Sequence, residues 1–203
     1  MKKKYLFYVM GCCWMLLIVH CGVYPSWETE RRNAIYYDMD PSIPIMGRGR
    51  ATTEQLIAFF SATHKPFDYS YVRQVTQTYI QESSIEGVNS DVAFCQMCIE
   101  TNYLRFGGQV QQSQNNFCGL GVTDDGDRGE TFESIRLGVR AHIQHLKAYA
   151  STKPLNRKTV DPRFNGVKRE SVVTIQGLAG TWASDPQYGN KIAQKLNELN
   201  QYF

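Results

Sequence analysis

The sequence predicts a mainly α-helical domain, and two observations lead to that prediction. Apolar residues recur at helical spacing through most of the chain after residue 50, as Val72, Val75 and Tyr79 do. One stretch, residues 105 to 129, interrupts this pattern. It is rich in Gly, Asn, Gln and Asp, which indicates a long loop with room for a small hairpin. At 203 residues, the chain is long enough for one domain with a real core.

The expected helices follow one another along this region. Residues 52 to 60 begin with a capping threonine and continue with an apolar stripe. Residues 90 to 104 give the strongest pattern, with a serine cap and nearly apolar sides, which predicts a central helix. The other expected helical segments are residues 71 to 82, 133 to 149, 172 to 182 and 188 to 199.

The N-terminus carries the formal charge of +3. Lys2, Lys3 and Lys4 are the only charged residues before Glu28, and removing them leaves 19 basic against 19 acidic residues. The rest of the chain therefore lacks the net charge of a nucleic-acid-binding protein. An apolar run of residues 5 to 19 follows the lysines, so residues 1 to 24 are predicted to be a signal peptide or a membrane anchor.

Cleavage of this segment, lipidation at Cys21 and retention as an anchor all stay open. Residues 25 to 50 contain several prolines and glycines without a sustained period, which predicts a linker or surface arm. The predicted domain then occupies residues 51 to 203.

Charge is unevenly distributed within the neutral part of the chain. Residues 28 to 127 carry 7 basic and 13 acidic side chains, whereas residues 128 to 169 carry 10 basic and 3 acidic ones. Two interpretations fit this distribution: solvated faces that offset one another, or a groove with one acidic and one basic wall.

Glu100 is the first candidate for catalysis. It lies late in the apolar helix and just before the glycine-rich loop, where partial burial would raise its pKa. A carboxyl with a raised pKa suits a general acid near neutral pH. The alternative is a glutamate that points into solvent.

A second group of carboxylates occupies the loop itself, at Asp124, Asp125, Asp127 and Glu130. A loop carboxylate that faces a helix carboxylate across a cleft is the arrangement used in glycoside hydrolysis. Turn capping and a calcium loop are the alternatives, although the ligand spacing of an EF-hand is missing.

The pairs Cys95/Cys98 and His142/His145 raise the possibility of a zinc site. The histidine spacing is one residue short of the usual pattern and both cysteines lie in an apolar helix, so core packing is the favoured interpretation and no metal site is predicted. Cys118 could pair with Cys95 or Cys98 in an oxidising compartment, and the disulfide state stays open.

Several segments together resemble a known family. They are Val92–Gly108, Gln114–Gly121, Ser134–Tyr149, Val160–Phe164 and Trp182–Gly189, with Ile45-Met46-Gly47 upstream. They resemble, in order, the bacterial glucosaminidases of glycoside hydrolase family 73. The resemblance implies a lysozyme-like α+β fold with a small β-hairpin lobe beside the active-site cleft.

The resemblance also implies a function. It implies hydrolysis of the β-1,4 bond after N-acetylglucosamine in peptidoglycan, without a cofactor. The N-terminal segment predicts export to the bacterial cell envelope, and we expect a monomer. A lytic transglycosylase, which needs only one acid, and a catalytically silent wall-binding module are the alternatives.

Roles for individual residues follow from the same resemblance. Glu100 takes the position of the catalytic acid, and Tyr188 that of a late active-site tyrosine. Glu130 is the first choice for the second carboxylate and Asp127 the next. The resemblance also gives Asn115, Asn116 and Phe117 as substrate-binding residues in the groove floor. Independently of it, Tyr103 and Trp182 are expected to bind substrate because sugar rings stack on aromatic faces, with core packing as the alternative.

Overall fold

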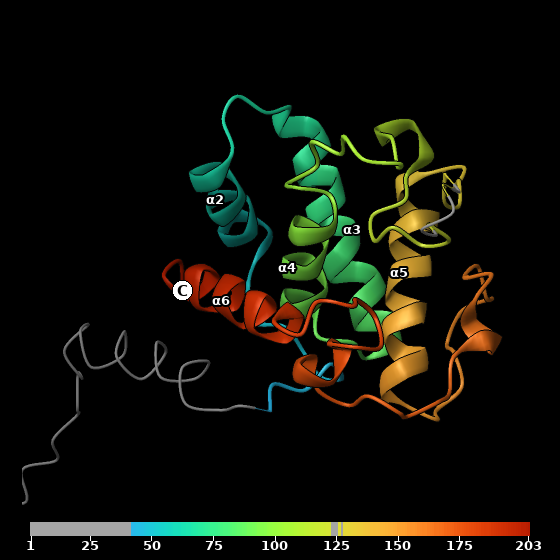
Figure 1. Cartoon of the computed structure of the whole chain (residues 1–203). Helices are drawn as coiled ribbons and strands as arrows, with labels where there is room; N and C mark the ends of the chain where they lie inside the picture. Colours follow the sequence, from blue (N-terminus) through green and yellow to red (C-terminus); the bar gives the residue numbers. More distant parts are fainter. Residues whose placement is uncertain (1–41, 123–125, 127) are drawn as a thin grey trace, which may run out of the picture.

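Helices form the framework of the computed structural model, which describes residues 42–122, 126 and 128–203 (Figure 1). The prediction of a mainly α-helical domain is therefore confirmed. The α-helices are α2 (Thr53–Thr63), α3 (Tyr69–Glu86), α4 (Ser90–Glu100), α5 (Ile135–Ala150) and α6 (Tyr188–Asn200). Three short 3₁₀ helices lie between them: η1 (Gln112–Gln114), η2 (Phe164–Gly166) and η3 (Ile175–Leu178).

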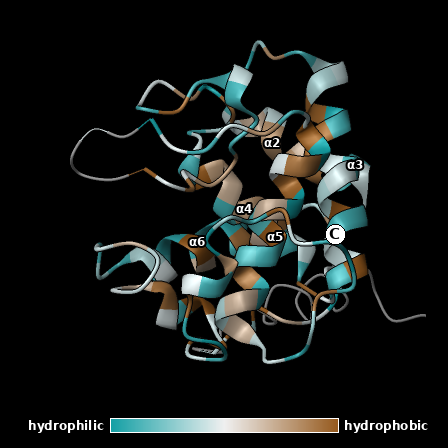
Figure 2. Cartoon of the chain, turned by 90° about the vertical axis from the view of Figure 1, so that its right-hand side faces the viewer, coloured by the Kyte–Doolittle hydropathy of each residue, from teal (hydrophilic) through white to brown (hydrophobic). Residues whose placement is uncertain are grey.

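Helix α4 lies in the middle of the domain, as its apolar sequence predicts. Every residue from Ser90 to Cys98 is buried, and the helix packs against α3, α5 and α6. Figure 2 shows the hydrophobic residues gathered in the interior among the helices. The side chain of Asn89, and not Ser90, caps the helix by accepting hydrogen bonds from the backbone N–H groups of Asp91 and Val92.

The folded part of the chain begins earlier than the predicted boundary at residue 51. Ile43 is 4% exposed and Ile45 is fully buried. The backbone N–H of Ile45 donates to the carbonyl of Val173 at 3.0 Å, and its carbonyl accepts from the N–H of Asn89 at 2.9 Å. Ile43 and Ile45 thus belong to the core, and the predicted arm over residues 25 to 50 extends too far.

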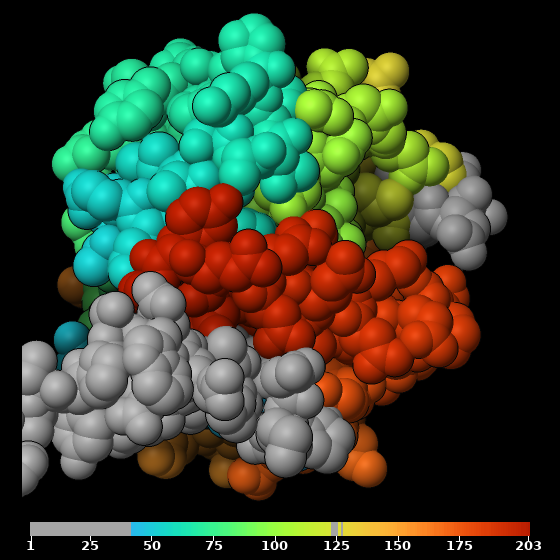
Figure 3. All heavy atoms as spheres, turned by 90° about the vertical axis from the view of Figure 1, so that its left-hand side faces the viewer, coloured from blue at the N-terminus to red at the C-terminus, as the bar shows by residue number. Residues whose placement is uncertain are grey.

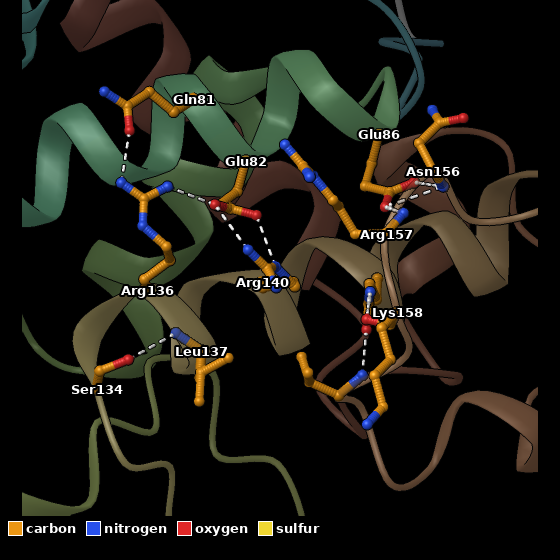
Figure 4. Close-up of polar contacts among 12 residues, drawn as sticks. Gln81, Glu82, Glu86, Ser134, Arg136, Leu137, Arg140, Asn156, Arg157 and Lys158 are labelled. Carbon is orange, nitrogen blue, oxygen red and sulfur yellow. Dashed lines mark hydrogen bonds and ion pairs between the residues drawn. The ribbon is translucent and has the colours of Figure 1, made fainter.

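Ion pairs join α3 to α5 on the side where the basic residues of α5 lie (Figure 4). Glu82 accepts from Arg136 at 2.6 Å and from Arg140 at 2.8 Å. Glu86 pairs with Lys147 at 2.8 Å, and both of these side chains are almost fully buried. These basic side chains hold two helices together, and none of them lines the pocket described below.

Helix α4 ends at Glu100, and not at residue 104 as the pattern predicts. Asn102, Tyr103 and Leu104 all have left-handed backbone conformations, with φ between 49° and 58°. The hydroxyl of Thr101 bonds back to the carbonyl of Met97 at 2.7 Å and accepts the N–H of Leu104 at 2.9 Å. This side-chain hydrogen bonding competes with the helix and stabilises the turn.

The predicted helix over residues 172 to 182 is also wrong. Only the 3₁₀ turn η3 forms there, and Gly180 follows it with a φ of 78°. Two glycines, Gly177 and Gly180, interrupt this stretch and lower its helix propensity.

The β-hairpin lobe is not confirmed. An isolated bridge joins Val122 to Arg128, and the described residues form only isolated bridges of this kind.

Figure 3 shows α6 crossing one face of the molecule beside α2. In the described part of the chain no helix is long and apolar enough to cross a membrane. The predicted signal segment, residues 1 to 24, lies outside that part.

Candidate active site

Glu100 is the last residue of α4 and faces a pocket of about 370 Å³. Three parts of the chain surround this pocket: the turn and loop after α4, the glycine-rich segment around residue 119, and the turn before α6. The lining residues are Glu100, Thr101, Phe106, Gly108, Gln109, Val110, Asn116, Cys118, Gly119, Val122, Trp182 and Ala183.

The two oxygens of the Glu100 carboxyl have different surroundings. Oε1 accepts a hydrogen bond from the indole Nε1–H of Trp182 at 3.1 Å and a short one from the hydroxyl of Tyr188. Oε2 lies beside Gly119: a Cβ atom added to this glycine would lie 3.7 Å from Oε2. One oxygen is therefore held by the protein, and the other lies beside a pocket residue that has no side chain.

Burial raises the pKa of Glu100 above its ordinary value, and the hydrogen bonds from Tyr188 and Trp182 offset part of this effect. The nearby titratable groups stay neutral. Burial raises the pKa of Tyr188 far above that of an ordinary tyrosine, and it also raises that of the Cys118 thiol well above its usual value. Glu100 is thus a carboxyl held closer to its protonated form than an ordinary glutamate, between neighbours that stay neutral.

Tyr188 is fixed because α6 begins with it. Its side chain is 4% exposed, and the next residue, Gly189, packs so tightly that a Cβ there would lie 2.7 Å from the Cα of Gln176. The start of α6 is therefore held against η3. This contact aims the Tyr188 hydroxyl at Glu100, although the two residues are far apart in the sequence.

Trp182 is supported by neighbouring aromatic rings. The rings of His142, His145 and Tyr149 lie between 5.2 and 6.0 Å from it. His145 is held in turn by Asp161, with 2.7 Å between Nδ1 and Oδ2. Because Trp182 lines the pocket and is only half-buried, it offers a rigid aromatic surface there.

The asparagine motif builds the wall of the pocket. The Asn116 side chain accepts the backbone N–H of Leu120 at 3.0 Å and donates to the carbonyls of Leu120 and Glu130. Asn115 is left-handed and donates to the carbonyl of Phe132 at 2.9 Å. Asn116 lines the pocket, whereas Asn115 anchors the loop through Phe132 and does not line it.

Two predicted aromatic contacts lie in the core instead. Phe117 is fully buried and packs against Tyr79 and Phe106. Tyr103 packs between the rings of Phe59 and Phe60, because the left-handed turn directs it toward α2. Neither side chain lines the pocket.

The second carboxylate is not located by the structure. Glu130 is partly buried beside Gly121, its N–H donates to the carbonyl of Leu120 at 2.8 Å, and it does not line the pocket. Asp127, together with Asp124 and Asp125, lies outside the described residues.

The cysteine and histidine pairs are used for packing. Cys95, Cys98 and Cys118 are free and buried. His142 hydrogen-bonds to Tyr79 and Gln96, and the described residues hold no group of three or more potential metal ligands.

Sequence reasoning missed Gln96 in the hydrogen bonding of the site. Its side chain is fully buried and donates to the Tyr188 hydroxyl at 2.9 Å. A signal was present, because Gln96 lies four residues before Glu100 and such residues share one face of a helix.

Comparisons with known proteins give the family of the chain. No solved structure matches the chain. An uncharacterised protein of Borreliella burgdorferi is 44% identical over 205 residues, and the alignment covers 100% of this chain and 97% of the relative. The glucosaminidase family model, described as mannosyl-glycoprotein endo-beta-N-acetylglucosaminidase, matches residues 76–201. The match supports a function of the peptidoglycan-hydrolase kind and includes Glu100, Trp182 and Tyr188. This chain belongs to the glucosaminidase family.

Proposed function

We propose that this protein is an endo-β-N-acetylglucosaminidase that cleaves the β-1,4 bond after N-acetylglucosamine in peptidoglycan, with Glu100 as the general acid.

We also propose that the basic and apolar N-terminal segment exports it to the cell envelope, where this substrate lies. Fusion of residues 1 to 24 to a reporter that is active only outside the cytoplasm tests the export.

One observation carries the proposed chemistry: a largely buried carboxyl faces a pocket with one oxygen anchored by two donors. Burial favours the protonated acid, which is the form that can donate to a glycosidic oxygen. The anchored oxygen restricts the carboxyl to one orientation, as a positioned acid requires. Family membership supplies the substrate class.

In the proposed reaction, Glu100 gives its proton to the leaving oxygen as the bond from that oxygen to the sugar carbon breaks. The sugar then develops oxocarbenium-like positive charge. A loop carboxylate, with Glu130 as first choice and Asp127 next, or the acetamido group of the substrate assists from the opposite face. The half-buried Trp182 ring provides a surface on which a sugar can stack.

A lytic transglycosylase is the second candidate, and a specific observation favours it. Among the described residues that line the pocket, Glu100 is the sole carboxylate. A lytic transglycosylase needs only one acid and closes the product into an anhydro ring without water. The two candidates therefore differ in their products.

Product analysis decides between the candidates. Digestion of purified peptidoglycan by the wild-type chain is expected to release fragments with a reducing N-acetylglucosamine end, identified by mass spectrometry after borohydride reduction. Anhydro-muramic ends would identify a transglycosylase. Binding to the wall without released fragments would identify a silent binding module.

The reaction rate is expected to fall as pH rises through the pKa of Glu100, which lies above the ordinary value of 4.5. The sign follows from the role, because only the protonated acid can donate. The Tyr188 hydroxyl, which bonds to Glu100, has a raised pKa, as do the Tyr79 hydroxyl and the Cys118 thiol, whose charges would interact with that of Glu100; all three stay neutral. Initial rates from about pH 4 to about pH 9 measure this profile. Circular dichroism over the same range provides the control for folding, and a rate that keeps increasing with pH contradicts the assignment.

A further inference from the structure

A chain of hydrogen bonds runs through the core to Glu100. The Tyr79 hydroxyl lies 2.8 Å from His142 Nδ1, and His142 Nε2 lies 3.0 Å from Gln96 Oε1. Gln96 Nε2 donates to the hydroxyl of Tyr188 at 2.9 Å, and that hydroxyl bonds to Glu100 Oε1. Helices α3, α5, α4 and α6 each contribute one member of the chain before Glu100.

The residues of this hydrogen-bond chain beyond Tyr188 have no access to the pocket. Tyr79, His142 and Gln96 are fully buried, and none of them lines the pocket. The Tyr79 ring packs against Phe94, Phe117 and the His142 ring. These residues cannot touch a substrate in this arrangement, so any effect on catalysis must pass through Tyr188.

Only two directions of hydrogen bonding satisfy the whole chain. In the first, every hydrogen points toward Glu100: Tyr79 donates to His142 Nδ1, His142 Nε2–H to Gln96, Gln96 to Tyr188, and Tyr188 to Oε1. In the second, the Gln96 amide is flipped, so that its NH₂ donates to His142 and its oxygen accepts from Tyr188, and every other donor reverses. Glu100 must then carry its proton on Oε1 and give it to Tyr188. A proton held in that way points at the protein and not at the pocket.

Tyr79 decides between the two directions. Within the described part of the chain, its hydroxyl makes a single hydrogen bond, the one to His142. In the reversed direction this hydroxyl would accept from His142, and its own hydrogen would be left without a partner in the core. A buried donor without an acceptor is costly, which favours the direction toward Glu100.

We propose that Tyr79, His142 and Gln96 are positioning residues, which fix the Tyr188 hydroxyl as a donor to Oε1 and thereby keep the acidic proton of Glu100 on Oε2, beside Gly119. This proposal rests on the proposed role of Glu100 as the acid. It assigns a defined state to His142: neutral, with its hydrogen on Nε2. Burial lowers the pKa of His142 to about 3, so this state persists at the pH of the reaction.

The test combines a spectroscopic and a kinetic measurement on the full-length chain. Long-range ¹H–¹⁵N correlation spectra report which ring nitrogen of His142 carries hydrogen, and the His142→Gln variant assigns the signals. Wild type is expected to show hydrogen on Nε2. In Tyr79→Phe the terminal donor is lost and Nδ1 has no partner in either direction, so the preference for hydrogen on Nε2 is expected to weaken and a population with hydrogen on Nδ1 to appear.

The same Tyr79→Phe variant is expected to lower kcat on soluble glycan oligomers about 3- to 10-fold, the equivalent of one neutral hydrogen bond. KM is expected to stay the same, because Tyr79 does not reach the pocket. Tyr71→Phe is the matched control, because it makes the same change on α3 at a residue that is not part of the hydrogen-bond chain. It is expected to keep the wild-type kcat.

The outcomes separate the hydrogen-bond chain from the proposed function. Hydrogen on Nδ1 of His142 in wild type overturns the proposal. A Tyr79→Phe variant also overturns the proposal if either quantity stays as in wild type: the position of the hydrogen on His142, or kcat. The position of the hydrogen on His142 is measured without substrate. A folded wild-type protein that fails to cleave peptidoglycan therefore counts against the proposed function and not against the hydrogen-bond chain.

Discussion

Replacing Glu100 with glutamine is expected to lower cleavage of peptidoglycan by about 10²- to 10⁴-fold, the contribution that a general acid makes. Glutamine has nearly the same shape, and its carbonyl oxygen can still accept from Trp182 and Tyr188. It cannot donate a proton to a leaving group. Zymograms and release of soluble fragments measure the loss.

Stability separates this loss from misfolding. Because burial raises the pKa of Glu100, the folded state favours the protonated carboxyl, and this contribution to stability is lost as pH rises through that pKa. Glu100→Gln should therefore match or exceed the thermal stability of wild type at neutral pH, and the difference should grow with pH. Glu133→Gln, which removes an exposed carboxylate, is the control and should retain activity. Wall degradation by a folded Glu100→Gln variant would rule out the proposed acid.

The second large effect is expected from Lys147→Met, which should lower the free energy of unfolding by about 3–5 kcal/mol. Lys147 pairs with Glu86 at 2.8 Å, and the two side chains are 3% and 0% exposed. Removing the cation leaves a buried carboxylate whose other partners are the backbone N–H groups of Asn156 and Arg157. Urea denaturation followed by circular dichroism measures the change.

Two further variants show whether the lost charge is the cause. Lys191→Met makes the same substitution in an exposed pair with Asp185 and is expected to cost less than about 1 kcal/mol. Adding Glu86→Gln to Lys147→Met removes the uncompensated charge and is expected to recover part of the loss. Equal destabilisation by the two lysine substitutions would show that the buried pair does not brace α3 against α5.

The helices of the domain could be predicted because their apolar patterns are strong and local. The expected helix over residues 52 to 60 corresponds to α2, whose Thr52 cap and Gln55 form a capping box. The errors arose where side chains override the local pattern. The Thr101 hydroxyl stops α4 at Glu100, and the burial of Ile43 comes from contacts with residues far along the chain.

The candidate site could be predicted in part. Glu100 stands out because a carboxylate in an apolar helix is unusual, and the resemblance to the family pointed to Tyr188. The placement of Tyr103 in the core depends on a left-handed backbone that leaves no local signal in the sequence. The spacing of Gln96 and Glu100 places both on one face of α4, but the sequence does not identify the partners of Gln96, because His142 and Tyr188 come from α5 and α6.

The left-handed turn after Glu100 separates two parts of the site that evolution can change independently. The acid lies on a helix buried among three others, whereas residues 108 to 110, which line the same pocket, are largely exposed. The turn ends the helix between them, so an insertion in the exposed wall need not alter the register of α4. Relatives can therefore acquire pockets of different size or polarity around an acid that keeps its position.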